Sequence, residues 1–447
     1  MEFLERCRRF ISVESTPNTG NVDAAQLAAQ WCREAGLHVS LQEGVIAGVA
    51  QMNVIARPVE SRPSSEILFQ THLDTASPGA YSLWTETDRN PFNATIHGDR
   101  IYGLGAANSK LDFLCKLEAI KQIGNKKWKT PFVLVGTYGQ EIGMFGAKKI
   151  VQEDMVSAQL AVIGEPTDLQ PVLSCNGSVV AEFFIPFSEE EKNYRSEHEK
   201  AESTATQSRI FRGKAAHSST PHLGENAIMK LVRYLNDLPE SVAVLTIDGG
   251  TFHNIVPEQA FIEIDMSRVF TNNIGRRFLK LIKEMESLSM TFLNFQDNQF
   301  DPPTPTFNVG VVRTYEDGIQ VMVNLRLTPS VAEPALQEWR ARIRGFCQTS
   351  EIRFRTREYK PPVITSEDRY LVKTALSVLK NLGCEARGIN KSTTNESSIY
   401  TSSGIESLVI GPGTTVGNSH GPNEHNSIQQ LEIAVKLYGK MIESMCL

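Results

Sequence analysis

The chain has 447 residues, of which 41% are hydrophobic and 21% charged, a composition typical of a soluble globular protein. This length exceeds what one ordinary hydrophobic core supports, so two domains are expected. A net charge of -6 with both signs interspersed argues against a nucleic-acid partner, and no apolar run reaches transmembrane length.

The N-terminus and the cysteines predict the compartment. The first residues lack the basic-then-apolar pattern of a signal peptide, so we expect a cytoplasmic protein. Seven scattered cysteines, without a C-x-x-C pair, suggest neither a disulfide framework nor a cysteine-ligated zinc site. We interpret them as small buried hydrophobes in a reducing environment.

The first part of the chain alternates predicted helices with short apolar strands. Helical spacing of apolar residues covers 1–12, 24–36 and 109–123. Strand-like runs cover the residues 52–56, 67–70, 132–135 and 160–163. This alternation predicts an α/β sheet with helices on both faces.

The pattern changes after about residue 175. An apolar run at 179–185 leads into a charged segment, 188–206, for which we expect an exposed hairpin tip or partial disorder. Predicted helices at 225–235 and 274–288 then alternate with strand pairs up to residue 327. These features indicate a smaller, mainly antiparallel α+β domain. Two of its strand pairs end in an arginine, which leaves an internal duplication open.

The α/β pattern resumes near residue 360. Helices are predicted at 368–382 and 427–445, and a buried strand at 408–410 leads into a glycine-rich loop. We therefore predict a larger α/β domain formed by residues 1–174 and 358–447, interrupted by an inserted domain at 175–357.

Side chains able to hold a divalent metal follow four of the predicted strands. They are His72, the pair Gln140 and Glu141, Glu165, and His420. One histidine or glutamate after a strand is more often structural. Open α/β sheets place their sites at the carboxyl ends of strands, however, so several such residues at one edge indicate a common site.

These residues belong to motifs that occur in a fixed order. The motifs are HLDT at 72–75, W-x6-P-F at 84–92, IYGLGAANSK at 101–110, QEIGMFGA at 140–147, GEPT at 164–167, HSSTPHLGENAI at 217–228, and GPG with SHGPNE between 411 and 424. Together they cover nearly the whole chain, which resembles the M20 metallopeptidases. That family includes acetylornithine deacetylases, succinyl-diaminopimelate desuccinylases, glutamate-type carboxypeptidases and dipeptidases.

The resemblance implies a fold, a reaction and an assembly. The fold would be a zinc-peptidase-like mixed sheet with helices on both faces, plus an inserted α+β lid and dimerisation domain. The reaction would be hydrolysis of the amide of an N-acyl amino acid or small peptide by a metal-activated water. The assembly would be a homodimer.

The resemblance also implies two zinc ions, with cobalt as an alternative metal. His72 and Glu165 would bind one ion, and Glu141 and His420 the other. Asp74 would accept a hydrogen bond from an imidazole and fix its tautomer.

The two remaining positions depart from the family. Asn108 stands where a bridging aspartate is expected, and Gln140 where the general base is a glutamate. A carboxamide offers one neutral oxygen and turns N–H donors toward the second metal, so Asn108 should weaken a dinuclear centre. Gln140 cannot accept a proton, and the loss of a general base lowers the rate by roughly 10²–10⁴.

Three interpretations of these departures remain open. The chain is an engineered inactive variant, a natural homologue that has lost catalysis, or an enzyme that uses another base or metal arrangement. Nucleophilic alternatives are weaker, because the sequence has no G-x-S-x-G elbow and Cys175 has no nearby histidine.

Five further residues are implied in catalysis or substrate binding. His217 would stabilise the tetrahedral oxyanion, Asn254 would lie near the substrate, and Gly413 would lie beneath it. Arg268 is a candidate for binding a substrate carboxylate bidentately, and Arg326, which ends the related segment, competes for that role.

Overall fold

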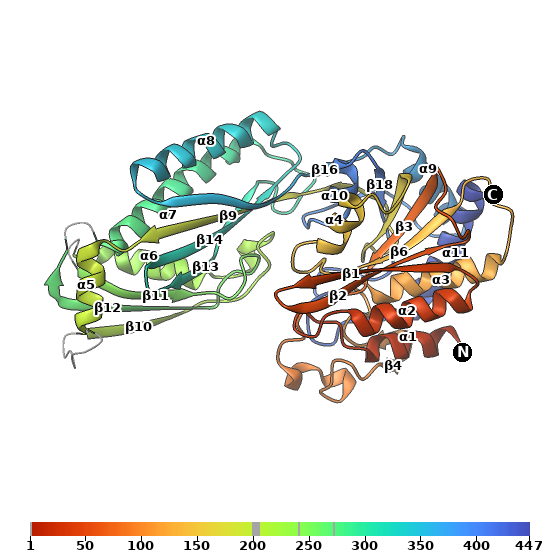
Figure 1. The fold of residues 1–447 in the computed structure, drawn as a ribbon, viewed down its shortest axis with the longest axis horizontal. Coiled ribbons are helices and arrows are strands. Elements are labelled where there is room, and N and C mark those ends of the chain that lie inside the picture. The colour runs from red at the N-terminus through yellow and green to blue at the C-terminus, as the bar shows by residue number, and fades with distance from the viewer. Residues whose placement is uncertain (1, 199–205, 240–241, 271–272) are drawn as a thin grey trace. The chain divides into compact units, whose positions relative to one another are not determined.

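A computed structural model describes residues 2–198, 206–239, 242–270 and 273–447. The chain folds into two compact units (Figure 1). Unit 1 contains Met1–Ser174, Val363–Ile389 and Asn395–Leu447, and unit 2 contains Cys175–Pro362 and Asn390–Thr394. Unit 2 extends beyond the predicted boundary at 357, because its last strand continues to Lys360 beside another strand of the same unit.

Unit 1 is built on a nine-stranded sheet. The strand order is β1-β2-β6-β3-β7-β18-β8-β16, with β17 paired to β8. These strands are β1 (His38–Ile46), β2 (Val49–Arg57), β3 (Glu66–His72), β6 (Phe132–Thr137), β7 (Ala158–Gly164), β8 (Val172–Cys175), β16 (Val363–Ile364), β17 (Ile389–Lys391) and β18 (Glu406–Val409). The neighbours β6, β3, β7 and β18 run parallel, while β1, β2 and β6 pair antiparallel. The mixed α/β architecture predicted from the sequence is confirmed.

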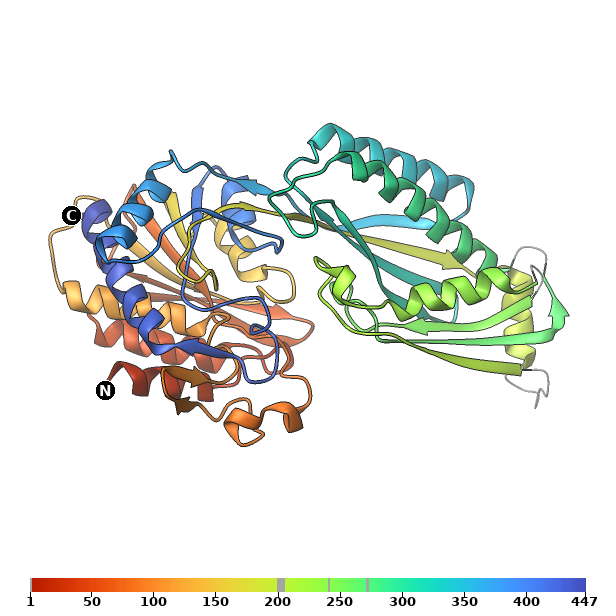
Figure 2. The same cartoon turned by 180° about the vertical axis from the view of Figure 1, so that it is seen from behind.

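Helices cover both faces of this sheet. They are α1 (Phe3–Ser12), α2 (Val22–Glu34), α3 (Lys110–Ile123), α4 (Phe145–Gln152), α9 (Tyr370–Asn381), α10 (Ser397–Ser402) and α11 (Ile428–Cys446). Ile67 and Phe69 of β3 lie in the core shared with α1, α2, α3, α9 and α11. The next residue, Gln70, points the other way, toward Glu396 just before α10, as the two-residue period of a strand requires. Figure 2 shows α3 and α11, which contact each other, against one face.

The connection from β3 to α3 carries short elements. They are η1 (Tyr81–Leu83), η2 (Thr85–Thr87), β4 (Thr95–His97) and β5 (Arg100–Tyr102). The last of these pairs with β19 (His425–Ser427) from the C-terminal segment, completing a three-stranded sheet with β4. The loop before α3 is therefore tied to the loop after β18, although about 320 residues separate them in sequence.

Unit 2 is an antiparallel sheet of seven strands in the order β10-β12-β11-β13-β14-β9-β15. The strands are β9 (Gly177–Pro186), β10 (Thr206–Arg212), β11 (Val242–Gly249), β12 (Gln259–Val269), β13 (Thr306–Thr314), β14 (Gly318–Leu327) and β15 (Arg353–Lys360). Its helices are α5 (Glu189–His198), α6 (Ala227–Asp237), α7 (Ile274–Thr291) and α8 (Glu333–Thr349), with short turns η3 (Pro221–Leu223) and η4 (Phe292–Asn294). Helices α6, α7 and α8 pack on the strands and share one apolar core with them.

The charged segment after β9 differs from the expectation. Its described part is a helix, α5, rather than a hairpin tip, and residues 199–205 lie outside the described residues. The buried carboxylate of Glu191 accepts hydrogen bonds from the backbone N–H of Ser188 (2.9 Å) and Ile274 (2.5 Å). It also pairs with Arg277 at 2.6 Å. This anchor to the start of α7 is a tertiary contact that composition does not reveal.

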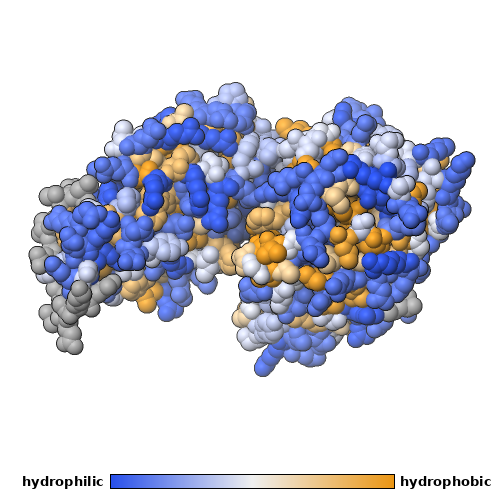
Figure 3. All heavy atoms as spheres, in the orientation of Figure 1, coloured by the Kyte–Doolittle hydropathy of each residue, from blue (hydrophilic) through white to orange (hydrophobic). Residues whose placement is uncertain are grey.

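Polar residues cover much of the face shown in Figure 3, with apolar residues in patches. Among the described residues, no helix is both long enough and apolar enough to cross a bilayer. The seven cysteines are free thiols, and all except Cys384 are buried, as the sequence predicted.

Candidate functional site

The predicted ligand residues lie at one edge of the unit 1 sheet. His72 is the last residue of β3, Glu165 directly follows β7, Glu141 follows β6, and His420 lies in the loop after β18. These four strands are parallel neighbours, so their carboxyl ends meet at the same edge.

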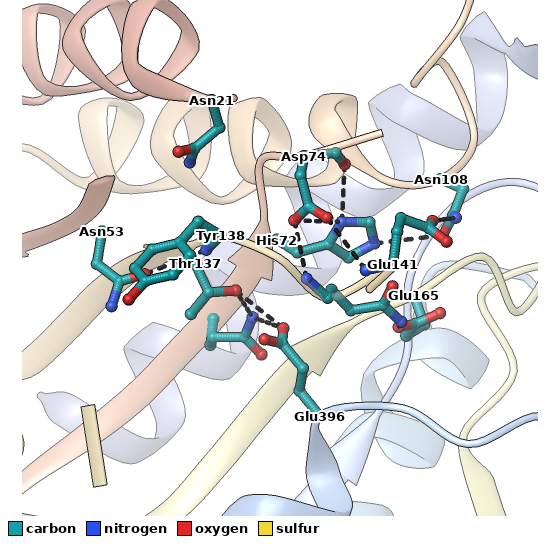
Figure 4. Close-up of polar contacts among 12 residues, drawn as sticks. Asn21, Asn53, His72, Asp74, Asn108, Thr137, Tyr138, Glu141, Glu165 and Glu396 are labelled. Carbon is teal, nitrogen blue, oxygen red and sulfur yellow. Dashed lines mark hydrogen bonds and ion pairs between the residues drawn. The ribbon is translucent and has the colours of Figure 1, made fainter. Parts of the chain in front are cut away.

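Asn108 lies among three of these side chains. Its carboxamide nitrogen is 2.6 Å from Oε1 of Glu141 and 2.6 Å from Nε2 of His420. Its oxygen is 3.3 Å from Nε2 of His72. Figure 4 shows Asn108, Glu141 and the His72 ring turned toward one another. The amide is therefore the centre of the cluster.

The backbone around Asn108 is fixed by a residue whose contacts the sequence did not reveal. Oε1 of the buried Glu424 accepts hydrogen bonds from the backbone N–H groups of Gly105 (3.1 Å), Ala107 (2.9 Å) and Asn108 (2.9 Å). Burial raises the pKa of Glu424 to about 7, although the N–H groups of Asn108 and Ala107 oppose the shift. Glu424 therefore holds the 105–108 loop in place.

Gly413 packs against the same loop. Its φ of +92° lies in the left-handed region, and a side chain there would approach Cβ of Ala107 to 3.1 Å. Its backbone N–H donates to Gln430 at 2.8 Å, and its carbonyl accepts from Asp168 at 2.8 Å. Glycine is thus required here for both conformation and space.

Asp74 holds the backbone at Gln140 and Glu141. Its two carboxylate oxygens each accept a backbone N–H, from Gln140 at 3.1 Å and from Glu141 at 3.1 Å. Nδ1 of His72 is 2.9 Å from the backbone carbonyl of Asp74 and 3.5 Å from its carboxylate. The closest acceptor for the imidazole is thus the carbonyl, because the carboxylate is used to hold the turn at 140–141.

The side chain of Gln140 points to another predicted ligand. Its Nε2 donates to Oε1 of Glu165 at 3.3 Å. A glutamate in this position would set two carboxylates against each other, whereas the amide supplies a donor. Asn108 and Gln140 therefore both act as hydrogen-bond donors to acidic ligand-type residues.

Electrostatics couple the histidines to the carboxylates. Burial lowers the pKa of His420, but the neighbouring Glu141 outweighs it and raises the value to about 9. Burial likewise opposes charge on His72, yet Asp74, Glu165 and Glu141 raise its pKa well above the usual value. For Glu141, burial raises the pKa, and His420 with His72 and Asn108 lowers it overall. The cluster thus pairs imidazolium groups with carboxylates.

A buried acid lies beneath the site on the other face of the sheet. Oε2 of Glu396 accepts hydrogen bonds from Gln70 and, at 2.9 Å, from Thr137, whereas its Oε1 is buried without a partner among the described atoms. Burial raises its pKa to about 8, so this carboxyl is protonated at neutral pH. Nothing in the sequence around Asn395 and Glu396 identified it.

Three predicted substrate-site residues of unit 2 gather around Ser218. Its backbone N–H donates to the carbonyl of Asn254 at 2.9 Å, and its Oγ accepts from Nε of Arg326 at 3.2 Å. His217 precedes it, and Ser218 itself is fully buried. The HSST motif drew attention to His217 only, because a buried serine gives no separate signal in the sequence.

His217 and Arg326 are both oriented by local hydrogen bonds. Nδ1 of His217 accepts from the backbone N–H of Ser219 at 3.2 Å and lies 2.7 Å from its hydroxyl, which leaves the proton of the neutral ring on Nε2. Arg326 also donates to Thr394 at 2.8 Å, and burial lowers its pKa to about 10. Arg268 lies in β12, but its side chain is outside the described residues.

The donor set does not fit a two-metal centre. A bridge between cations needs two anionic oxygens, whereas Asn108 presents an N–H group to Glu141 and its carboxamide nitrogen lies beside His420. In the described part of the chain, no group of three or more His, Cys, Asp or Glu side chains is arranged to hold a metal ion. The terminal ligand types are present, but the bridging carboxylate is not.

Unit 1 carries ligand-type residues at the ends of parallel strands, and its chain is interrupted by the antiparallel unit 2. The chain belongs to peptidase family M20/M25/M40, whose sequence profile matches residues 68–444. It is therefore an M20-type hydrolase, of a class that acts on amide bonds.

Known proteins resemble this chain in sequence or in fold over nearly their whole length. The chain is 25% identical to an acetylornithine deacetylase of Pectobacterium carotovorum subsp. carotovorum (strain PC1) over 460 aligned positions, covering 99% of this chain and 98% of that protein. The M20 metallo-carboxypeptidase Sso-CP2 from Sulfolobus solfataricus superposes with a TM-score of 0.62 at 20% identity, covering 99% of both chains. The Bacillus subtilis YXEP protein, described as a dinuclear metal-binding peptidase of the family, gives 0.51 at 12% identity, covering 98% and 96%.

Proposed function

We propose that this chain is an M20-type amidohydrolase for N-acyl amino acids or small peptides whose turnover is weak or absent. Asn108 and Gln140 stand at the positions of the bridging aspartate and the general base that the family resemblance implies. The remaining ligand types, His72, Glu141, Glu165 and His420, lie at the carboxyl ends of neighbouring strands.

One observation supports the reduced turnover above all others. The carboxamides of Asn108 and Gln140 donate hydrogen bonds to Glu141 (2.6 Å) and Glu165 (3.3 Å). A group that donates an N–H here does not take a proton from water. The loss of a general base corresponds to roughly 10²–10⁴ in rate, or about 3–5.5 kcal/mol of barrier.

Divalent metal binding is part of the proposal only in a limited form. Zinc, or cobalt in its place, would be bound by His72 with Glu165 or by Glu141 with His420, without a shared carboxylate. Two ions held tightly are not expected, because the residue between the two pairs is a neutral amide.

Substrate recognition is proposed for residues of unit 2. The buried guanidinium of Arg326, held by Ser218 and Thr394, is suited to a substrate carboxylate. His217, with its outer ring nitrogen protonated, is suited to donate to an oxyanion. Asn254, whose carbonyl accepts a hydrogen bond from Ser218, would lie near the substrate. Gly413 of unit 1 would lie under it.

The second candidate function is that of a non-catalytic binding protein. It is favoured by the same pair of carboxamides, because they complete the cluster without providing a base. Binding of an N-acyl amino acid without turnover, even with added zinc or cobalt, would identify it. The homodimer and the cytoplasmic location remain predictions, and sedimentation equilibrium tests the first.

Parallel turnover and binding measurements test the proposed function. The purified chain, with zinc or cobalt added, is assayed on N-acetylated amino acids and dipeptides, and the same compounds are titrated calorimetrically. We expect saturable binding with turnover at least about 10²-fold below that of an acetylornithine deacetylase measured alongside. Equal turnover in the two proteins would contradict the proposal.

A matched pair of variants tests which arginine binds the substrate carboxylate. Arg326→Lys keeps the charge but removes the bidentate geometry, so it should weaken binding of an N-acetyl amino acid by at least about tenfold. Arg268→Lys should change binding little, measured by the same calorimetric titration. A larger loss for Arg268→Lys would reverse the assignment.

A further inference from the structure

The cluster at the sheet edge is held together by amide hydrogen bonds. Asn108 contacts Glu141, His420 and His72 through one planar group, and Gln140 contacts Glu165. Each atom that the resemblance would assign to a metal thus faces a carboxamide in this chain.

The chemistry of the carboxamide explains why this arrangement is stable as it stands. An amide carries an acceptor and two donors, so it can take a hydrogen bond from His72 and give one to Glu141, which also pairs with His420 at 3.1 Å. Aspartate at 108 would instead place a second carboxylate oxygen at the position now 2.6 Å from Oε1 of Glu141. Two like charges at that distance require a cation or a proton between them.

The donors are also fixed in place by the backbone. The N–H of Asn108 is bound by Glu424 at 2.9 Å, and the N–H of Gln140 by Asp74 at 3.1 Å. These anchors hold the backbone from which both carboxamides project, without help from a ligand. Their hydrogen bonds to Glu141 and Glu165 therefore need little reorganisation.

From this geometry we propose that the carboxamides of Asn108 and Gln140 replace the divalent metal as the bridge between the ligand-type side chains. The cluster is then complete as a metal-free hydrogen-bonded network. Metal binding has to break the contacts of Asn108 before it gains its own. The inference rests on the same two positions as the proposed function, but it concerns metal content and stability rather than turnover.

Metal content and thermal unfolding of the full chain test the inference. The unaltered protein, purified without added metal, should contain less than one zinc ion per chain by elemental analysis. Its melting temperature should be unchanged by EDTA. Asn108→Asp should melt lower without metal, and added zinc should raise its melting temperature. Calorimetric titration should give at least about a tenfold gain in zinc affinity for this variant.

Two further variants keep the test decisive. Asn21→Asp changes a buried asparagine of unit 1 that bonds the backbone of Met52. It should lower the melting temperature without a response to zinc. In Gln140→Glu, added zinc should also raise the melting temperature, but by less than in Asn108→Asp. This variant provides the test if Asn108→Asp does not fold.

The contrary outcomes are specific. Two zinc ions per unaltered chain, with melting lowered by EDTA, would overturn the inference, as would equal zinc responses in Asn108→Asp and Asn21→Asp. Those results without turnover would leave the proposed function intact. If a metal-free chain turned over substrate at the rate of an active relative, the proposed function would be contradicted and the inference about metal content would stand.

Discussion

At the scale of single residues, the carboxamides of Asn108 and Gln140 donate hydrogen bonds to Glu141 and Glu165. The sequence was sufficient to select His72, Glu141, Glu165 and His420, because each follows an apolar strand in a recognisable motif. It also predicted that the carboxamide at 108 would turn N–H donors into the centre. Which acceptors those donors would reach depends on tertiary distances that no local pattern encodes.

Other residues at the site could not be predicted for the same reason. Glu424 binds the backbone of the 105–108 loop, and Ser218 links residues far apart in the sequence. Glu396 meets its partners across two strands. Side chains that act on distant backbone leave no periodic or spacing signal around themselves.

Glu396 provides a residue-scale prediction about pH. Its folded-state pKa is about 8 against 4.5 when exposed, so the folded protein binds this proton more tightly than the unfolded chain. The contribution of this carboxyl to the free energy of unfolding is therefore fully present below about pH 4.5. It is lost as the pH rises toward 8, which lowers the free energy of unfolding by on the order of 4 kcal/mol. Glu396→Gln, which mimics the protonated acid, should remove that loss.

The measurement is urea unfolding at pH 5.5 and pH 8.5. The stability of Glu396→Gln relative to the unaltered chain should be clearly greater at pH 8.5. The exposed Glu367→Gln is the control and should show no such change. An equal difference for Glu396→Gln at both pH values would refute the buried, protonated state.

At the scale of secondary-structure elements, one buried network holds the strand ends that carry the site. Nζ of Lys116 in α3 donates to the carbonyl of Gln70 (2.7 Å), the hydroxyl of Thr71 (2.8 Å) and the carboxylate of Asp112 (2.7 Å). Tyr438 of α11 donates to Asp112 and to the carbonyl of Ile410 at 3.0 Å. Helices α3 and α11 are thereby locked to β3 and to the segment after β18.

Glycine permits the same network to reach a third strand. A Cβ at Gly164, the last residue of β7, would lie 1.8 Å from the carboxylate of Asp112. The sequence predicted α3 and β7 from their apolar residues, but it gave no sign that charged side chains of a helix would be buried beneath strand ends. Buried ion pairs look like surface pairs when only spacing is visible.

Loss of the cation from this network should be costly. Lys116→Met leaves the buried Asp112 without its ion pair, so the free energy of unfolding should fall by about 3–5 kcal/mol in urea titration. Lys121→Met, on the exposed side of the same helix beside Glu118, should change it by less than about 1 kcal/mol. Similar losses in both variants would argue against a structural role for the network.

At the scale of the whole molecule, the chain contains two separate apolar cores. One belongs to unit 1 and is assembled from both ends of the chain, because β18 lies between β7 and β8 and α11 packs on α3. The other belongs to unit 2. The change from alternating helices and strands to strand pairs was enough to predict two architectures. The strand order could not be predicted, because local patterns do not reveal pairing between strands more than 200 residues apart.

This division predicts different fates for two fragments. Residues 175–362 contain the whole second core, so the isolated fragment should show antiparallel β circular dichroism and cooperative thermal unfolding. Residues 1–174 lack β18 and α11 and should not unfold cooperatively. The opposite pattern would mean that the two units do not fold as the cores indicate.

The most direct test of the central claim is the turnover of the double variant Asn108→Asp with Gln140→Glu, measured with added zinc on N-acetylated amino acids beside the unaltered chain. Restoring both carboxylates should increase kcat/KM by at least about 10²-fold, since a base and an anionic bridge return together. An unaltered chain that is already as active as the double variant would show that these two positions do not limit the reaction.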